Sequence, residues 1–183
     1  MNIKAGWVAG ALRIPSPNCD NRPDGAEVSL LVLHSISLPR GKYGKVSGSS
    51  AIERLFTNRL DPAAHPSFAD LAGLRVSAHF LIYRDGALVQ FVPLQDRAWH
   101  AGVSNWRGRE RCNDFSVGIE LEGTDDSAFA AAQYLRLAQL ARTLQYLLPI
   151  SDIAGHSDVA PGRKSDPGEQ FSWKRFLSDL ARA

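Results

Sequence analysis

The chain has little cysteine, no long hydrophobic run and no excess of one charge. Its two cysteines, Cys19 and Cys112, are too few for a disulfide framework, so we expect two free thiols in a reducing compartment, with one disulfide as the alternative. No segment approaches the roughly 20 apolar residues of a membrane span. The short apolar stretch near the start is followed directly by Arg13, Pro15 and Pro17, unlike a secretory signal. These absences predict a cytoplasmic protein that does not contact a membrane.

The charges are nearly balanced, with a formal net charge of +2 and basic residues scattered among acidic ones. Nucleic-acid binding needs a concentrated basic patch, so we expect no nucleic-acid partner. A small anionic substrate remains compatible with this balance. The 183 residues, with 44% hydrophobic and 22% charged, are typical of a globular chain. We expect one domain over residues 1–183, acting as a monomer.

Strands and helices are mixed along the sequence. The Asp-Gly pair at 85–86 lies between two apolar runs and predicts a β-hairpin. Leucine and alanine recur at helical spacing between 127 and 148. The expected strands are 29–34, 76–83, 87–92 and 115–121, and the expected helices are 51–57, 127–148 and 171–182. Such a mixture predicts a single α/β or α+β domain.

Two candidate functional groups lie on predicted strands. His34 ends the apolar run SLLVLH, where a buried strand meets a loop, although a half-buried structural histidine is the alternative. Glu120 lies between two apolar residues in VGIELEG, and a buried carboxylate needs a partner. Strand alternation places it on one face with Glu122, which is also compatible with an ordinary solvent-facing side.

A third candidate is the pair His156 and Asp166, with Lys164 just before the aspartate in a loop rich in proline and glycine. Histidine and carboxylate are both zinc ligands, but this spacing matches no short zinc motif, and a polar surface loop is the alternative. Two histidines and one aspartate would leave a fourth position for water, whose pKa zinc lowers to about 7. With a glutamate to move protons and a lysine to stabilise an oxyanion, the set suits amide hydrolysis.

The sequence resembles the zinc N-acetylmuramyl-L-alanine amidases, and within them the 1,6-anhydro-N-acetylmuramyl-L-alanine amidases of the AmpD type. The resemblance is carried by SLLVLHSISLP, LRVSAHFLI, RAWHAGVSNWRGRERCNDFSVGIELEGTD and GHSDVAPGRKSDPG, and it extends from GWVAGALRIPSPN to FSWKRF. It implies a central mixed β-sheet flanked by helices, with a groove above the sheet that holds one zinc ion per chain. It also implies zinc ligands at His34, His156 and Asp166, a general base and acid at Glu120, and an oxyanion-stabilising cation at Lys164.

The same resemblance implies an anhydromuropeptide substrate, cut between the lactyl group of the sugar and L-alanine during recycling of cell-wall fragments. It makes Arg75, Trp99 and Arg111 candidates for substrate contacts, since arginine grips carboxylates and tryptophan offers a flat face to a sugar. Ser35 stands where the family pattern has asparagine, and its shorter side chain reaches less far toward a substrate amide. Gly162 stands where glutamate is common.

Two other functions fit the family resemblance. Some relatives lack the metal and only bind peptidoglycan, and phage lysins cut the intact wall. The complete set of expected ligands favours catalysis, and the end-to-end match favours the anhydro-type enzyme. Three glycines in residues 37–50, directly after His34, predict a lid over the groove.

Overall fold

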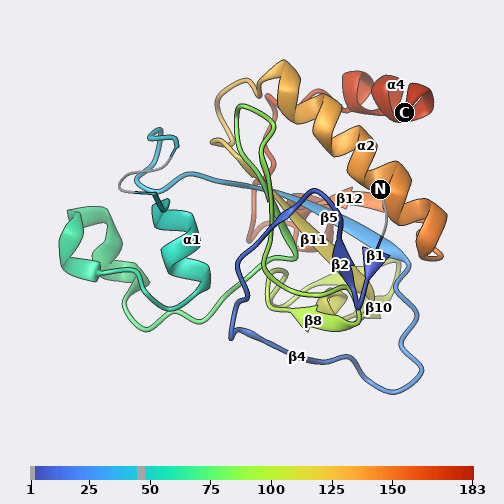
Figure 1. Ribbon diagram of the computed structural model, residues 1–183, viewed down its shortest axis with the longest axis horizontal. Coiled ribbons are helices and arrows are strands. Elements are labelled where there is room, and N and C mark those ends of the chain that lie inside the picture. Colours follow the sequence, from blue (N-terminus) through green and yellow to red (C-terminus); the bar gives the residue numbers. More distant parts are fainter. Residues whose placement is uncertain (1–2, 45–47) are drawn as a thin grey trace.

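A six-stranded mixed β-sheet forms the centre of the molecule (Figure 1). The computed structural model describes residues 3–44 and 48–183. The pairs β12–β5, β5–β11, β11–β6 and β7–β3 are parallel, and β6–β7 is antiparallel. In sheet order, the strands are β12 (Asp152–Gly155), β5 (Leu30–Ile36), β11 (Ser116–Glu122), β6 (Phe80–Ile82), β7 (Leu88–Gln90) and β3 (Leu12–Arg13).

Shorter elements surround this sheet. Three two-stranded ladders pair β1 (Ile3–Lys4) with β2 (Trp7–Val8), β4 (Cys19–Asn21) with β8 (Asp96–Ala98), and β9 (Asn105–Trp106) with β10 (Arg109–Glu110). The α-helices are α1 (Ala51–Phe56), α2 (Ala131–Leu147), α3 (His156–Val159) and α4 (Trp173–Arg182). The 3₁₀ turns are η1 (Pro62–Ala64), η2 (Pro66–Leu71) and η3 (Cys112–Phe115).

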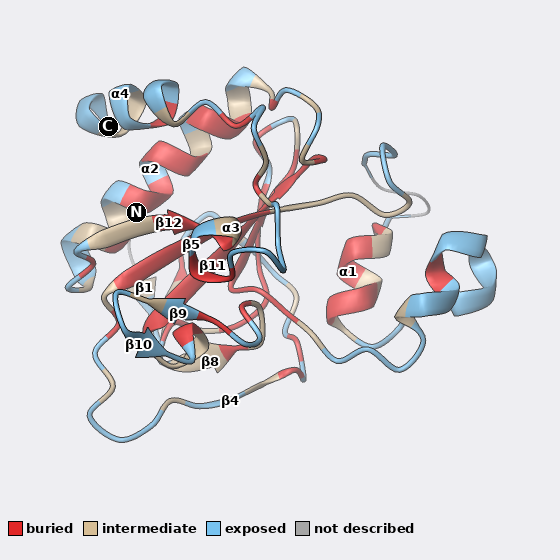
Figure 2. Cartoon of the chain, turned by 180° about the vertical axis from the view of Figure 1, so that it is seen from behind, coloured by how far each residue is buried: buried red, intermediate tan, exposed pale blue. Residues whose placement is uncertain are grey.

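Helices α2 and α4 cover one face of the sheet, where they lie together in Figure 1. Apolar residues recur every three or four positions along α2, so one side of the helix is an apolar face. That side packs against alternate residues of the two central strands, which point to the same face. The buried cluster includes Leu31, Leu33, Val117, Ile119, Leu137, Leu140 and Leu144. Figure 2 shows β11 buried along its length and β5 buried except at its last two residues.

The intervening residues of β5 and β11 point to the opposite face, away from α2. Leu30 and Val32 join a second buried cluster there. His34 continues the same alternation along β5, and Glu120 does so along β11. The candidate site therefore lies on the face of the sheet that the long helices leave uncovered.

The structure confirms the mixed sheet flanked by helices, the hairpin at Asp85-Gly86 and the three predicted helices with shorter bounds. The loop predicted to hold His156 and Asp166 is wrong at its start, because His156–Val159 form the short helix α3. Strand β12 was not predicted at all. Both cysteines are free thiols, as expected. Across 3–44 and 48–183, no helix is long and apolar enough to cross a membrane.

The predicted lid, residues 37–50, is described only in part, because residues 45–47 lie outside the described ranges. Its first half is anchored, since the Gly44 backbone N–H donates to Glu122 Oε1 at 2.6 Å. The lid role stays a prediction.

Candidate metal centre

The register of three parallel strands brings the candidate site together. Parallel strands end at the same edge of a sheet, so residues that follow them become neighbours. In the β5–β11 ladder, Glu120 lies directly beside His34. In the β5–β12 ladder, Gly155 pairs with Leu33, so the next residue, His156, comes level with His34. Two histidines 122 positions apart thus meet because of backbone pairing alone.

Asp166 completes a compact set of three possible ligand atoms. The Nδ1 atoms of His34 and His156 are 2.9 Å apart, and each lies 3.1 Å from Asp166 Oδ2. Both histidines are buried and the aspartate is partly buried. Zinc binds nitrogen and oxygen at about 2.0–2.2 Å, so one ion can reach all three corners of so small a triangle. The donor set therefore fits a divalent cation with an open coordination position.

The outer nitrogen of each histidine is already engaged. His156 Nε2 lies 3.2 Å from the Ala101 carbonyl, which accepts its N–H. His34 Nε2 lies 3.0 Å from His100 Nδ1. With the protons on Nε2, the Nδ1 lone pairs of both rings point into the triangle, as metal ligands require.

Burial lowers the pKa of His34 to about 4, although the close contact with Asp166 opposes that shift. Burial alone would raise the pKa of Asp166, but the close contacts with His156 and His34 outweigh it and hold that pKa well below its usual range. Neutral imidazoles beside an ionised carboxylate are the protonation states that metal ligands need.

Local backbone contacts aim Asp166 at the histidines. The Ser157 N–H donates to the Asp166 carbonyl at 2.8 Å, which ties the end of the loop to the first turn of α3. The Gly155 N–H donates to Asp158 Oδ2 at 2.7 Å and so fixes the start of that turn. Further along, Gly168 lies so close to the Asp125 backbone that a Cβ atom would collide with the Asp125 carbonyl oxygen.

Glu120 is a buried carboxyl with an unsatisfied oxygen. The residue is 8% exposed, and no described residue hydrogen-bonds to Oε2. Burial raises its pKa well above the ordinary value, with a further rise from Asp166 and a smaller opposing effect from Lys164. Glu122 on the same strand differs, because it accepts backbone N–H groups from Gly44 and Arg84. An unpaired buried carboxyl beside the triangle is therefore a group available for proton transfer.

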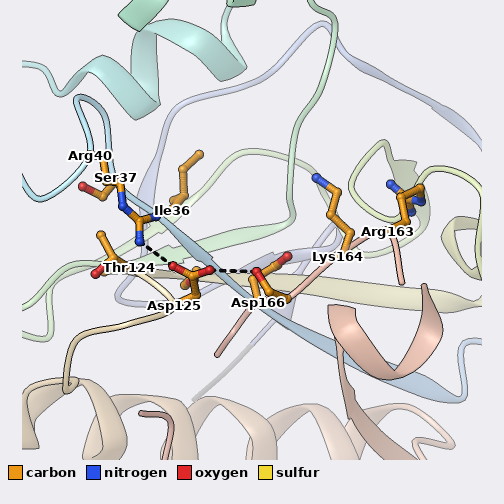
Figure 3. Close-up of a pocket in the computed structure, with 11 residues that line it drawn as sticks. Ile36, Ser37, Arg40, Thr124, Asp125, Arg163, Lys164 and Asp166 are labelled. Carbon is orange, nitrogen blue, oxygen red and sulfur yellow. Dashed lines mark hydrogen bonds and ion pairs between the residues drawn. The ribbon is translucent and has the colours of Figure 1, made fainter. Parts of the chain in front are cut away.

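A groove of about 310 Å³ opens beside the triangle (Figure 3). Ser35, Lys164 and Asp166 all line it, and the Lys164 side chain extends along its wall. Its opposite rim is tied together by Asp125, which accepts from Arg40 and from the Ser165 hydroxyl, each at 2.7 Å. The groove places a primary ammonium group near the candidate metal ligands.

The three predicted substrate contacts lie outside this groove. Arg111 is exposed, pairs with Asp114 at 3.3 Å and lines a second groove of about 510 Å³. Trp99 Nε1 donates to Asp20 Oδ1 at 3.1 Å. Arg75 is exposed. Of the predicted substrate-binding residues, Ser35 alone lies beside the triangle, and the roles of all four stay predictions.

Sequence reasoning missed the residues that support the triangle. His100 and Ala101 hold the outer nitrogens of the two histidines, and Arg163 donates to the Ala101 carbonyl at 2.5 Å. These residues lie in irregular segments, where no periodicity marks a side chain as buried. The WHAG motif was part of the family resemblance, but nothing in its spacing pointed to His34.

The comparisons with known proteins agree with this geometry. Residues 24–169 match the family model described as N-acetylmuramoyl-L-alanine amidase. The chain is 55% identical to the 1,6-anhydro-N-acetylmuramyl-L-alanine amidase AmpD of Escherichia coli (strain K12), over 96% of this chain and 95% of that protein.

Two solved structures extend the comparison. A crystal structure of a selenomethionine AmpD derivative superposes with a TM-score of 0.94 at 54% identity, covering 98% of this chain and 99% of that one. The E. coli amidase AmiD, in complex with its substrate anhydro-N-acetylmuramic acid-L-Ala-D-γ-Glu-L-Lys, has a TM-score of 0.60 at 29% identity, covering 87% of this chain and 60% of that one.

Proposed function

Since the chain belongs to the N-acetylmuramoyl-L-alanine amidase family, we propose that it is a zinc-dependent amidase of anhydromuropeptides. It hydrolyses the amide between the lactyl group of 1,6-anhydro-N-acetylmuramic acid and L-alanine, during recycling of cell-wall fragments in the cytoplasm. The observation that carries the proposal is the buried triangle of His34, His156 and Asp166 beside the unpaired carboxyl of Glu120.

One zinc ion per chain, held by these three side chains, would lower the pKa of a water molecule to about 7 and polarise the scissile carbonyl. Glu120 takes the proton of the attacking water on its free Oε2 and passes it to the leaving amino group of L-alanine. The Lys164 ammonium stabilises the negative charge that develops on the carbonyl oxygen. Lys164 also opposes the upward shift in the pKa of Glu120, and so favours the carboxylate form that can accept a proton.

The remaining groups would bind the two ends of the substrate. Ser35 lines the groove, which supports a contact between its hydroxyl and a substrate amide. The exposed guanidinium groups of Arg75 and Arg111 suit carboxylates of the stem peptide, and the ring of Trp99 suits the sugar. We expect the enzyme to act as a monomer.

The test is amidase activity together with zinc content, measured on the wild type, Asp166→Ala and Glu120→Gln. The substrates are anhydromuramyl-tripeptide and its reducing-sugar analogue. We expect the wild type to hold about one zinc and release free tripeptide, Asp166→Ala to lose both zinc and turnover, and Glu120→Gln to keep zinc and lose turnover. Asp70→Ala, an exposed aspartate on η2, is the matched control.

Each other outcome points to a different function. A zinc-loaded wild type without turnover on either substrate would indicate a peptidoglycan-binding module. Equal turnover of both sugars, with activity on intact wall polymer, would indicate a lysin-type amidase. A wild type that binds no zinc would contradict the proposed mechanism.

A further inference from the structure

Both histidines of the triangle have their outer nitrogens held by two consecutive residues, His100 and Ala101. We propose that this pair acts as a positioning clamp, in which the His100 side chain fixes the tautomer of His34 and so selects Nδ1 as its metal-binding atom. The inference rests on the proposed zinc site and adds to it a positioning residue that does not touch metal or substrate.

The distances define a short chain of hydrogen bonds. His34 Nε2 lies 3.0 Å from His100 Nδ1, and His100 Nε2 lies 3.2 Å from the Ser116 hydroxyl. The His34 and His100 rings meet edge to face, with centroids 5.0 Å apart and an interplanar angle of 85°. This orientation aligns the His100 lone pair with the edge of the His34 ring.

The positions of the protons follow from the metal-binding role of His34. A neutral imidazole that offers Nδ1 to a cation carries its proton on Nε2. That N–H needs an acceptor, and His100 Nδ1 is the nitrogen in front of it. His100 must then carry its own proton on Nε2, facing the Ser116 hydroxyl, which can accept it. The opposite tautomer of His100 would set two N–H groups against each other.

The clamp is itself held in place from two sides. Asn113 Oδ1 accepts both backbone N–H groups of the clamp, from His100 at 3.1 Å and from Ala101 at 2.8 Å. Beneath the ring, Gly118 leaves the space that His100 fills, because a Cβ there would be 2.5 Å from His100 Cγ. A glycine in the middle of a buried strand weakens it, so this one has a packing reason.

The two ligands therefore differ in how they are oriented. His156 donates to a backbone carbonyl, which substitution of a side chain does not remove. His34 donates to a side chain, so its orientation depends on the identity of residue 100. Outer partners of metal-binding histidines change metal affinity by about 10–100-fold when they are lost.

The test compares His100→Asn with His100→Gln in the full chain. The asparagine amide oxygen takes roughly the place of imidazole Nδ1 and keeps an acceptor for His34. The glutamine amide takes roughly the place of Nε2, so it keeps the contact to Ser116 and loses that acceptor. The first measurement is zinc affinity by competition with a chromophoric chelator, and the second is the histidine tautomers by long-range ¹H–¹⁵N NMR of the zinc-loaded protein.

We expect His100→Gln to weaken zinc binding by about 10–100-fold and His100→Asn to stay within a few-fold of the wild type. In the wild-type spectrum, the protons of His34 and His100 should both lie on Nε2. His65→Gln, at an exposed histidine of the same chain, is the control for the substitution itself, and thermal unfolding of the metal-free variants shows that each folds.

Equal zinc affinity of the wild type and His100→Gln, or a His34 proton on Nδ1 in the zinc-loaded protein, would overturn the clamp and leave the proposed amidase intact. Absence of zinc from the wild type would overturn the proposed function, and the clamp with it.

Discussion

At the scale of single residues, Glu120 is held where its charge costs stability. Its pKa is raised in the folded chain, mainly by burial. A carboxyl with a raised folded-state pKa destabilises the protein as pH rises past its unfolded pKa, about 4.3 for glutamate, toward the folded value. Selection for stability alone would favour a neutral side chain here, so the presence of a carboxyl agrees with the proposed role of Glu120 in proton transfer.

This predicts a pH-dependent gain in stability for Glu120→Gln in the metal-free protein. The variant should unfold at higher urea than the wild type at pH 7–8, because it has no buried charge, and the two should converge below about pH 4. The measurement is urea unfolding of both proteins across that range. Glu169→Gln, an exposed glutamate, should show no such difference. A constant gap at all pH values would mean that burial of the charge is not the cause.

Lys164 is the second residue with a specific expectation. Replacing it with alanine removes the cation beside the triangle, and we expect kcat to fall by about 10²–10³ with zinc content unchanged. Steady-state kinetics and metal analysis of the same preparation check this. Lys174→Ala on the exposed side of α4 should behave as the wild type. A loss of zinc rather than of kcat would assign Lys164 a role in holding the loop.

At the scale of elements, the segment after α3 holds Asp166 against its neighbours through one glycine. Gly168 has a φ of +92° and lies against the Asp125 backbone, whereas Gly162 has a φ of +75° and no described atom within 4 Å of the place that a Cβ would take. Substitution of Gly162 therefore tests backbone strain alone, whereas substitution of Gly168 tests backbone strain together with a collision.

We expect Gly162→Ala to cost about 1 kcal/mol of unfolding free energy, from the left-handed backbone alone. Gly168→Ala should cost about 3 kcal/mol or more, since the turn that contains Asp125 must also move. It should weaken zinc binding as well, because Asp166 lies two residues away. Chemical denaturation and chelator competition measure both effects. An equal loss of unfolding free energy at the two positions would show that the contact with Asp125 does not affect stability.

The sequence predicted elements whose pattern is local. The Asp-Gly turn and the leucine spacing of α2 both depend on neighbours within one segment, and both were correct. Strand β12 has four residues, too short for any periodicity, and it exists because β5 offers an edge to pair with. Gln133 is a polar residue of α2 that is nevertheless buried, because its amide donates to the carbonyls of Ile82 and Glu122.

The site residues likewise divide into those that a local sequence pattern identifies and those that it does not. His34 and Glu120 were identifiable as polar groups interrupting apolar strands, and the family resemblance supplied their roles. His100, Arg163 and Asp125 were not identifiable, because their importance lies in contacts between loops that only the assembled chain brings together.

At the scale of the whole molecule, a bound ion would join β5 to the segment that follows β12. A ligand that binds only the folded state stabilises it by about 4 kcal/mol at a concentration 1,000 times its Kd. For a chain of this size, the expected rise in Tm is about 8–16 °C. Differential scanning calorimetry with and without zinc checks this, and Asp166→Ala should remove the shift. A zinc-dependent shift that survives in Asp166→Ala would place the ion elsewhere.

The strand register has a consequence for how the protein is made. His34 and Asp166 are separated by 132 positions, and the strand that brings His156 level with His34 is the last to join the sheet in chain order. During synthesis, the first histidine leaves the ribosome long before its partners exist. The chain therefore acquires tight metal binding only after Asp166 has been synthesised, so the ion distinguishes chains that extend past this residue from shorter ones.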